Sequence, residues 1–328
     1  MASVLQYSRA SDHHRQKPCK NLQYRREWRN LDDYQKADYI KAVLCLQAHP
    51  AKAPVYEEAK TRFDEFQAYH IQQTDFVHLV GQFLPWHRHF VQQYERALRD
   101  ECGYKGHSPY WDWTQDSESG FSIKQAPVFD PVTGFGGDGV PGTYVLPPNI
   151  ETSELIFPAE FRGCVQDGPF ANLTLRLGPG RHRTTHCLTR GIGNVDSMYL
   201  NSTAIANATK SATFEVFRVQ VEGKPITSDH RMHDGGHFAV GGDMSNFYSS
   251  PGDPLFFLHH ANIDRIWWNW QQMEPSRLYE ISGRTTVNPP YVNVTLDWSL
   301  QMSKSIGPTI PLWKVMDIHS EHNCYTYV

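Results

Sequence analysis

Apolar residues recur at intervals of three and four along several stretches of this chain, a spacing that places them on one face of a helix. Polar and charged residues occupy most of the remaining positions. The pattern predicts amphipathic helices over residues 32–46, after Pro54, and over residues 85–102, 230–241 and 255–273. Pro85 falls at the predicted start of the third helix, where a missing backbone N–H removes no helical hydrogen bond.

The middle of the chain, residues 116–195, is rich in Gly, Pro, Asp and Thr and lacks sustained periodicity. We expect long loops with short elements there, and an extended or irregular course for residues 1–30. No repeat, charge run or low-complexity linker divides the 328 residues. The sequence therefore predicts one mainly helical domain over residues 1–328.

Charge and hydropathy argue against two classes of protein. Lys and Arg total 31 against 35 Asp and Glu, which leaves no basic excess to bind a nucleic-acid backbone. No uninterrupted apolar run approaches the roughly 18 residues of a membrane-spanning helix. We expect neither a nucleic acid nor a membrane as a partner.

The cysteines form no C-x-x-C pair, so zinc-finger and thioredoxin spacings are absent. An even, widely scattered set is compatible with disulfides, and buried free thiols are the alternative. The sequence does not choose among the pairings. The cysteines are Cys19, Cys45, Cys102, Cys164, Cys187 and Cys324.

Four N-x-S/T sequons add to this picture, at Asn172, Asn201, Asn207 and Asn293. Together with the even number of cysteines, they favour a secreted glycoprotein. The first ten residues lack the apolar core of a signal peptide. We interpret the chain as a mature, secreted protein given without its export signal.

Histidine is unusually frequent, with 17 residues. About one H-x-x-x-H pair is expected by chance at this frequency, so the pairs His182/His186 and His233/His237 carry no weight by spacing alone. Context favours the second pair, because a strongly helical segment containing His260 follows it. Two histidines one turn apart, facing a third on another helix, can bind one metal ion.

A second trio lies upstream and consists of His70, His78 and His87. We expect His70 on the core-facing side of its helix, His78 in a loop, and His87 in the first turn of the next helix. The alternative is a set of ordinary polar histidines.

These residues carry a resemblance to a known family. The runs His70-x7-His78-x8-His87 within FLPWHR, His233-x3-His237-FAVGG, and DPLFFLHHANIDRIWW resemble the two copper-binding regions of tyrosinases and catechol oxidases. The likeness continues through SPYWDW at residues 108–113 and through residues 164–190, and is closest to the short fungal polyphenol oxidases. It implies a mainly α fold in which a central four-helix bundle holds a dicopper centre, with long loops and few short strands.

By this resemblance, two copper ions are bound by nitrogen ligands alone. The first would be held by His70, His78 and His87, and the second by His233, His237 and His260. Neutral imidazoles suit copper in both of its oxidation states. The implied reaction oxidises o-diphenols, and by extension o-aminophenols, to o-quinones while dioxygen, the co-substrate, is reduced to water; hydroxylation of monophenols is left open.

Two other functions are alternatives to this enzyme activity. A haemocyanin-like oxygen carrier uses comparable histidines without turnover, but carriers bury the pair behind an added domain, and we expect no C-terminal shielding domain before Val328. A dinuclear zinc hydrolase would normally include bridging carboxylates, which neither trio offers.

Departures from the family pattern suggest further roles. Phe76 stands where many relatives have a cysteine cross-linked to the second histidine, so that thioether cannot form here. Asp234 stands where monophenol-hydroxylating relatives often have Asn, and Glu222 resembles their conserved Glu. We hypothesise that Glu222 and Asp234 together set the protonation of the incoming phenol. Alternatively, Asp234 only accepts a hydrogen bond from a backbone or imidazole N–H.

The resemblance places Phe238 and Phe247 at the substrate entrance, where their rings could stack on a phenol. Phe256 is expected to pack beneath the site. His89 and His259 are expected to be hydrogen-bonded supporting groups or surface groups. Asp264 and Arg265 are expected to contribute an ion pair that locks two helices together.

Overall fold

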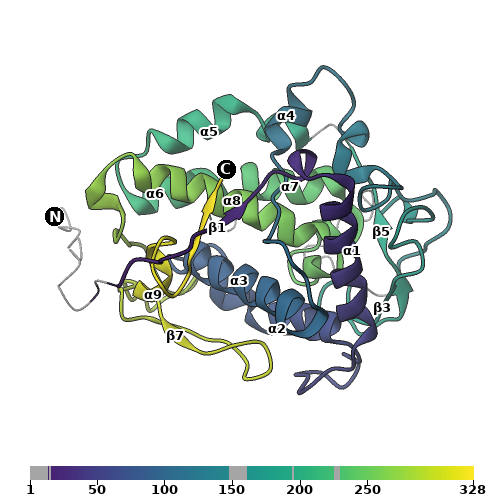
Figure 1. Cartoon of the computed structure of the whole chain (residues 1–328), viewed down its shortest axis with the longest axis horizontal. Helices are drawn as coiled ribbons and strands as arrows, with labels where there is room; N and C mark the ends of the chain where they lie inside the picture. The colour runs from purple at the N-terminus through teal and green to yellow at the C-terminus, as the bar shows by residue number, and fades with distance from the viewer. Residues whose placement is uncertain (1–13, 15, 148–160, 194–195, 225–229) are drawn as a thin grey trace.

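Helices form the interior of the protein, and loops with short strands surround them (Figure 1). The computed structural model describes residue 14 and residues 16–147, 161–193, 196–224 and 230–328. The stretches predicted to be irregular, 1–30 and 116–195, lie partly outside these residues. Where they are described, long loops predominate, as predicted.

The helices are α1 (Asp33–Ala48), α2 (Arg62–Val77), α3 (Phe83–Cys102), α4 (Trp113–Ser117), α5 (Ser202–Thr209), α6 (Phe214–Glu222), α7 (Met232–Val240), α8 (Leu255–Gln272) and α9 (Trp313–Met316). The strands are β1 (Gln23–Arg25), β2 (Gly163–Cys164), β3 (Thr174–Leu175), β4 (His186–Cys187), β5 (Thr189–Arg190), β6 (Ser299–Leu300), β7 (Ile310–Pro311) and β8 (Tyr325–Tyr327). The predicted fold class, mainly α with few short strands, is confirmed.

The central bundle consists of α2, α3, α7 and α8. In it α3 packs against both α2 and α8, and α8 packs in turn against α7. Helix α1 covers the other side of α3, and α5 and α6 lie along α8 and α7. Within the described residues, no helix is both long and apolar enough to cross a lipid bilayer.

Local sequence explains where these helices begin and end. Asp32 caps α1 by accepting the Gln35 backbone N–H, and the Gln35 side chain accepts in return from the Asp32 backbone. Helix α3 begins at Phe83, so Pro85 is its third residue rather than its first. Proline at the third position removes no helical hydrogen bond, because N–H groups of the first turn have no acceptor within the helix. Gly103 ends α3 in the left-handed conformation, with φ 71°.

Helices α5 and α6 were not predicted. In α5 only Ala208 is buried, so the helix has almost no apolar stripe to detect. In α6 the buried Phe214, Phe217 and Val221 do follow the helical interval, so the signal was present in a short segment.

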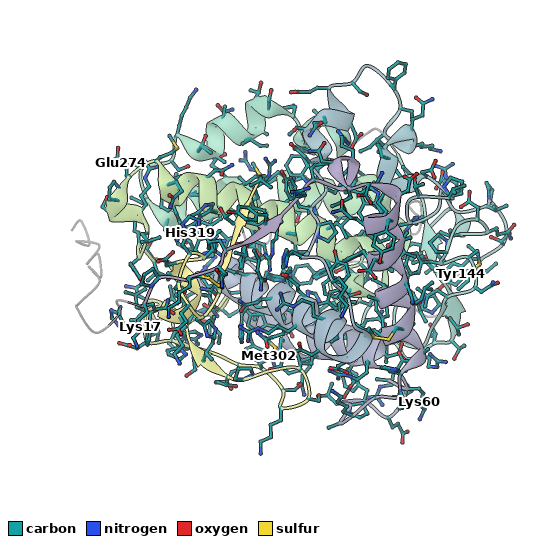
Figure 2. The ribbon with its side chains drawn as sticks, in the orientation of Figure 1. Lys17, Lys60, Tyr144, Glu274, Met302 and His319 are labelled. Atoms are coloured by element: carbon teal, nitrogen blue, oxygen red, sulfur yellow. A yellow bond between two sulfur atoms is a disulfide. The ribbon has the colours of Figure 1, made fainter. Side chains whose placement is uncertain are left out.

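Aromatic rings fill the space between α2, α3 and α8, where the side chains are densely packed (Figure 2). Tyr94 of α3 stacks on Phe257 of α8 with ring centroids 3.4 Å apart and ring planes at 4°. Phe66 of α2 meets Tyr94 edge-on at 5.2 Å. Such pairs contribute about 0.5–1.5 kcal/mol each beyond the burial of apolar area. They fix the spacing of the helices that carry the candidate ligands.

All six cysteines are paired, as Cys19–Cys324, Cys45–Cys102 and Cys164–Cys187, which excludes the free-thiol alternative. The first of these disulfides joins the two ends of the described chain beside the parallel pair β1–β8.

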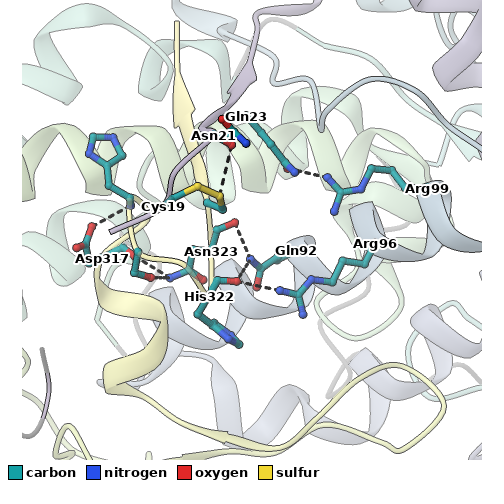
Figure 3. Close-up of a disulfide and its surroundings, with 12 residues drawn as sticks. Cys19, Asn21, Gln23, Gln92, Arg96, Arg99, Asp317, His322 and Asn323 are labelled. Carbon is teal, nitrogen blue, oxygen red and sulfur yellow. Dashed lines mark hydrogen bonds between the residues drawn. A yellow bond between two sulfur atoms is a disulfide. The ribbon is translucent and has the colours of Figure 1, made fainter. Parts of the chain in front are cut away.

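Side chains of α3 hold both terminal segments against the bundle (Figure 3). Arg99 donates to the Gln23 side chain at 2.6 Å, and Arg96 donates to the His322 carbonyl oxygen at 2.9 Å. The segments around Gln23 and His322 are therefore part of the structure that surrounds the bundle.

A buried group of charged and phenolic side chains, the Asp264 cluster, links α3, α8, β1 and β8. Its members are Asp264, Arg25, Arg88, Glu95, Tyr325 and Tyr327. The Asp264 carboxylate accepts from Arg88 and from the hydroxyls of Tyr325 at 2.7 Å and Tyr327 at 2.6 Å. The expected ion pair between helices therefore joins Asp264 to Arg88, whereas Arg265 pairs with Asp112 at 3.1 Å.

Replacing Asp264 should be costly, because Arg88 would stay buried without its carboxylate. We expect Asp264→Ala to lower the free energy of unfolding by about 3–5 kcal/mol, measured by denaturant titration of the copper-free protein. Asp100→Ala, which removes an exposed carboxylate from α3, should change it by less than about 0.5 kcal/mol. Equal effects of the two substitutions would contradict this role for Asp264.

Candidate metal centre

Three histidines from α2 and α3 converge in the interior. His70 lies in the middle of α2, His78 directly follows the last residue of α2, and His87 lies in the second turn of α3. His87 is thus one turn later than predicted, because α3 begins at Phe83. All three are buried, and each offers a ring nitrogen within 4.8 Å of those of the other two.

A second trio comes from α7 and α8. His233 and His237 are one turn apart on α7, and His260 approaches from α8. Nε2 of His237 lies 3.2 Å from Nε2 of His233 and 3.3 Å from Nε2 of His260. The three ring nitrogens therefore converge on one point.

The two trios face each other across the bundle. The rings of His87 and His260 stack with centroids 4.5 Å apart and planes at 13°. His78 and His233 approach to 6.0 Å between ring centroids. The structure thus brings together all six histidines that the sequence singled out.

Most of these rings are fixed by a hydrogen bond at Nδ1. The acceptors are the backbone carbonyl oxygens of Tyr248 for His70 (2.7 Å), Thr74 for His78 (3.0 Å), Phe83 for His87 (2.9 Å) and Met244 for His237 (2.8 Å), and the Asp234 carboxylate for His233 (3.0 Å). A carbonyl oxygen can only accept, so Nδ1 carries the proton and Nε2 keeps a free lone pair. This is the arrangement that orients metal-binding histidines in proteins.

The protonation of the trios fits a metal site. Burial lowers the pKa of His70 to about 4, and lowers the pKa of His78, His87, His237 and His260 well below the usual value for histidine. Neutral imidazoles are therefore expected at pH 7. Nε2 of His70 and Nε2 of His87 are buried without a hydrogen-bond partner. Unprotonated nitrogens this close repel each other unless a cation lies between them. The two histidine trios are therefore suited to bind metal ions through their ring nitrogens.

His259 is a fourth histidine beside the second trio. It is completely buried, and its ring centroid lies 4.7 Å from that of His237. Burial lowers the pKa of His259 well below the usual value for histidine, and a hydrogen bond with the His233 backbone opposes this effect. The alternative of a surface group is therefore wrong, whereas His259 does lie as a supporting group behind the second trio. Gly236 makes room for this ring, since a Cβ there would lie 2.2 Å from Cε1 of His259.

Two other predicted neighbours behave as expected. His89 is buried and donates from Nε2 to the Pro308 carbonyl oxygen at 2.9 Å, so it supports the C-terminal segment. Phe256 is fully buried and lies against both trios, with ring centroids 4.1 Å from His260 and 5.2 Å from His70.

Glu222 lies at the end of α6 and reaches the loop that follows His78. Its carboxylate accepts from the backbone N–H of Leu79 and from Arg218 at 2.8 Å. Leu79 has a φ of 59°, in the left-handed region that a leucine rarely adopts, so this contact fixes a strained backbone next to His78. Burial raises the pKa of Glu222 to about 8, despite the opposing effect of Arg218.

Asp234 follows His233 on α7, and its side chain is 32% exposed. Its carboxylate accepts from Nδ1 of His233 at 3.0 Å. Burial favours the neutral acid, but the interactions with His230 and His233 outweigh that effect and lower the pKa of Asp234 to about 2. This contact agrees with the alternative role, in which Asp234 accepts a hydrogen bond from an imidazole N–H.

The aromatic residues assigned to the entrance are half-buried. The ring of Phe247 lies 4.7 Å from that of His78, in the first trio, and the ring of Phe238 lies 4.9 Å from that of His230. Phe76 is 61% exposed and points away from the trios toward a surface cavity.

One supporting residue was missed by sequence reasoning. Asp243 is fully buried and accepts from the backbone N–H of Thr189 at 2.8 Å and from Nε2 of His186 at 2.9 Å. These bonds hold the turn in which Met244 presents its carbonyl oxygen to His237. Burial lowers the pKa of His186, but Asp243 outweighs it and the pKa is raised. Of the pair His182/His186, His186 therefore has a structural role.

One further group has the composition of a metal site, namely Cys45, His49 and Cys102. Because both sulfur atoms form a disulfide, no thiolate is available there.

Comparison with known proteins agrees with this geometry. The family model for the common central domain of tyrosinase matches residues 60–273. A tyrosinase-like protein of Diaporthe leptostromiformis is 39% identical over 94% of this chain and 78% of its own length. An N-acetyl-6-hydroxytryptophan oxidase of Emericella nidulans is 31% identical over 94% of this chain and 93% of its own length.

Among solved structures, a variant of the polyphenol oxidase from Thermothelomyces thermophila has a TM-score of 0.82 and 34% identity, covering 94% of this chain and 89% of that one. A functional unit of octopus hemocyanin has a TM-score of 0.52 at 22% identity, covering 93% of this chain and 68% of that one, which shows a shared fold. The matched residues include both histidine trios. The chain belongs to the tyrosinase family of type 3 copper proteins and is a copper-dependent oxidoreductase.

Proposed function

We propose that this enzyme is a polyphenol oxidase that converts o-diphenols, and by extension o-aminophenols, to o-quinones. Two molecules of diphenol would be oxidised for each dioxygen reduced to two waters. The observation that carries the proposal is the convergence of two imidazole trios, in the second of which Nε2 of His237 lies 3.2 Å from that of His233 and 3.3 Å from that of His260. His70, His78 and His87 would hold one copper ion, and His233, His237 and His260 the other.

Copper, when bound, supplies the electron transfer from the diphenol to dioxygen. The protein supplies rigid donors, since each Nδ1 acceptor belongs to a helix or a tightly bonded turn. The absence of carboxylates from the ligand set keeps the centre able to hold copper in both oxidation states.

We propose that phenols enter over Phe247, with Phe238 at the rim. Phe247 is half-buried and lies on His78, so its ring is placed to limit how far a substrate can approach the first trio. An aromatic face there could stack on a phenol, at about 0.5–1.5 kcal/mol per pair.

The two carboxyl groups would act differently on protons. Asp234 is ionised and partly exposed, so we propose that its carboxylate accepts a hydrogen bond from the hydroxyl of an incoming phenol. Glu222 would act as a positioning residue, through its bond to the Leu79 backbone beside His78. Both together would thereby set how a phenol is bound and deprotonated.

We also propose that the protein is secreted. The support is the presence of three disulfides, which persist in oxidising compartments, together with the sequons at Asn172, Asn207 and Asn293. Asn201 is less suited to carry a glycan. It caps α5, with its amide oxygen bonded to Ala204 and its amide nitrogen bonded to the Met198 carbonyl oxygen at 2.6 Å.

The central test follows quinone formation and oxygen uptake in air, with copper-loaded protein and with catechol or phenol as substrate. We expect rapid oxidation of catechol and slower oxidation of phenol. His87→Ala should lose copper and reduce catechol oxidation more than about 100-fold, because the loss of mere supporting residues costs 10–100-fold. His89→Gln, two residues further along α3, should keep wild-type copper content and activity. Protein with two coppers that oxidises neither substrate would favour an oxygen carrier.

Substrate size tests the proposed entrance. Removing the ring of Phe247 should widen the approach to His78, so we expect Phe247→Ala to raise kcat/KM for a bulky catechol relative to catechol by roughly three- to tenfold. The measurement is the ratio of the two constants. An unchanged ratio would place the entrance elsewhere.

The raised pKa of Glu222 predicts a pH effect on stability. Between the usual value of 4.5 and about 8, the unfolded chain releases this proton while the folded protein keeps it. The folded state is then penalised, so stability of the copper-free protein should fall as pH rises through this window. Glu222→Gln has no proton to release, and we expect it to show a smaller fall in denaturant titrations from pH 4.5 to 8. Identical slopes for the two proteins would rule out this titration.

A further inference from the structure

A cavity of about 610 Å³ lies outside the metal centre, where the end of α2 and the start of α3 meet residues 295–301. Its volume falls within the range of small-molecule sites, about 300–1,000 Å³. Two aromatic residues at its edge are unusually open to solvent, Phe76 at 61% and Trp298 at 37%. A cavity lined by aromatic rings together with a few polar groups is a candidate binding site for a small ligand.

The lining combines these rings with small polar groups. Gln73, Thr295 and Asp297 contribute amide, hydroxyl and carboxylate groups, and the Asp297 side chain is 77% exposed. Aromatic faces pack against the C–H faces of sugar rings, while such polar groups bond their hydroxyls. The chemistry of the cavity therefore fits a carbohydrate.

A sequon stands at the rim. Residues 293–295 read Asn-Val-Thr, and Thr295 itself lines the cavity. Val294 is 4% exposed, whereas Asn293 and Thr295 are exposed. This segment is extended: Asn293 pairs antiparallel with Arg284, and the Val294 N–H donates to the Gly283 carbonyl oxygen at 2.9 Å. Alternate residues of an extended segment point the same way, so Asn293 projects on the side of Thr295.

We propose that Asn293 carries an N-linked glycan whose first sugars lie in this cavity, against Trp298 and Phe76. A glycosyl pyrophosphate is the donor. The bond from its anomeric carbon to the phosphate oxygen breaks, and the pyrophosphate leaves with the electron pair. A new bond forms from that carbon to Nδ2 of Asn293, which loses one proton. The inference rests on the proposed secretion and is independent of the copper chemistry.

The glycan covers the outer side of the first trio. Trp86 lines the cavity from within and is 1% exposed, and its ring lies 6.1 Å from that of His70. Gln82 ties this region together by donating to the carbonyl oxygens of Phe76 at 2.7 Å and Thr285 at 3.0 Å. A sugar seated there holds residues 295–301 against the start of α3.

The experiment uses full-length protein secreted from a fungal host. Mass spectrometry of the peptide containing Asn293 measures occupancy, and hydrogen exchange measures protection of residues 295–301. We expect Asn293 to be glycosylated, and exchange of this segment to be about fivefold faster in Asn293→Gln than in the wild type. Asn172→Gln removes a sequon from an exposed turn elsewhere and should leave this segment unchanged.

Trp298→Ala keeps the sequon but removes the platform, and Phe76→Ala serves as a second such variant. If the sugar packs on these rings, Trp298→Ala should speed exchange as much as Asn293→Gln does, and the double variant should add little more. An unmodified Asn293 would overturn the proposal, and so would a glycan whose loss leaves exchange unchanged. Fully additive effects would also overturn it, because they would mean that the glycan and Trp298 do not touch. Catechol oxidation, measured on the same samples, reports separately on the proposed reaction.

Discussion

In a neutral imidazole, one ring nitrogen carries a proton and the other has a lone pair that can bind a metal ion. The metal centre depends on the proton being on Nδ1 and the free lone pair on Nε2. Four of the six histidines donate a hydrogen bond from Nδ1–H to a backbone carbonyl oxygen, and His233 donates one to the Asp234 carboxylate. Every Nε2 lone pair of these five is thereby directed inward. Burial lowers the pKa of the four histidines that are bonded to carbonyl oxygens, so these donors are ready for a cation without competition from protons.

The acceptors, in turn, depend on the rest of the fold. Thr74 lies in the last turn of α2, just before His78, and Phe83 lies in α3 with His87. Tyr248 and Met244 lie in the connection between α7 and α8. Asp243 holds that connection through Thr189 and His186, beside the Cys164–Cys187 disulfide. On the opposite side, the Asp264 cluster fixes α3 to α8, and with them His87 to His260. Distant loops thus contribute to ligand geometry without touching the metal.

Much of this could be predicted from the sequence, because the long amphipathic helices and the histidine register are local signals. The features that could not be predicted from the sequence also have physical reasons. Backbone carbonyl oxygens such as that of Met244 leave no trace in a sequence, since every residue has one. The complete burial of His259 could not be read from the sequence, because the space that its ring occupies is left by the missing side chain of Gly236, on another helix. The partner of Asp264 was misjudged because Arg88 is 176 residues away in the chain. The three disulfide pairings likewise could not be predicted, because they depend on which cysteines the fold brings together.

The Cys19–Cys324 disulfide, with a sequence separation of 305, closes residues 19–324 into a covalent ring. A protease that cuts once in any exposed loop between these cysteines opens the ring but releases no fragment. The ends also cannot diffuse apart when the chain unfolds, which restricts the unfolded ensemble and favours refolding. A molecule that stays in one piece after a single break in the backbone keeps both histidine trios of its metal centre together.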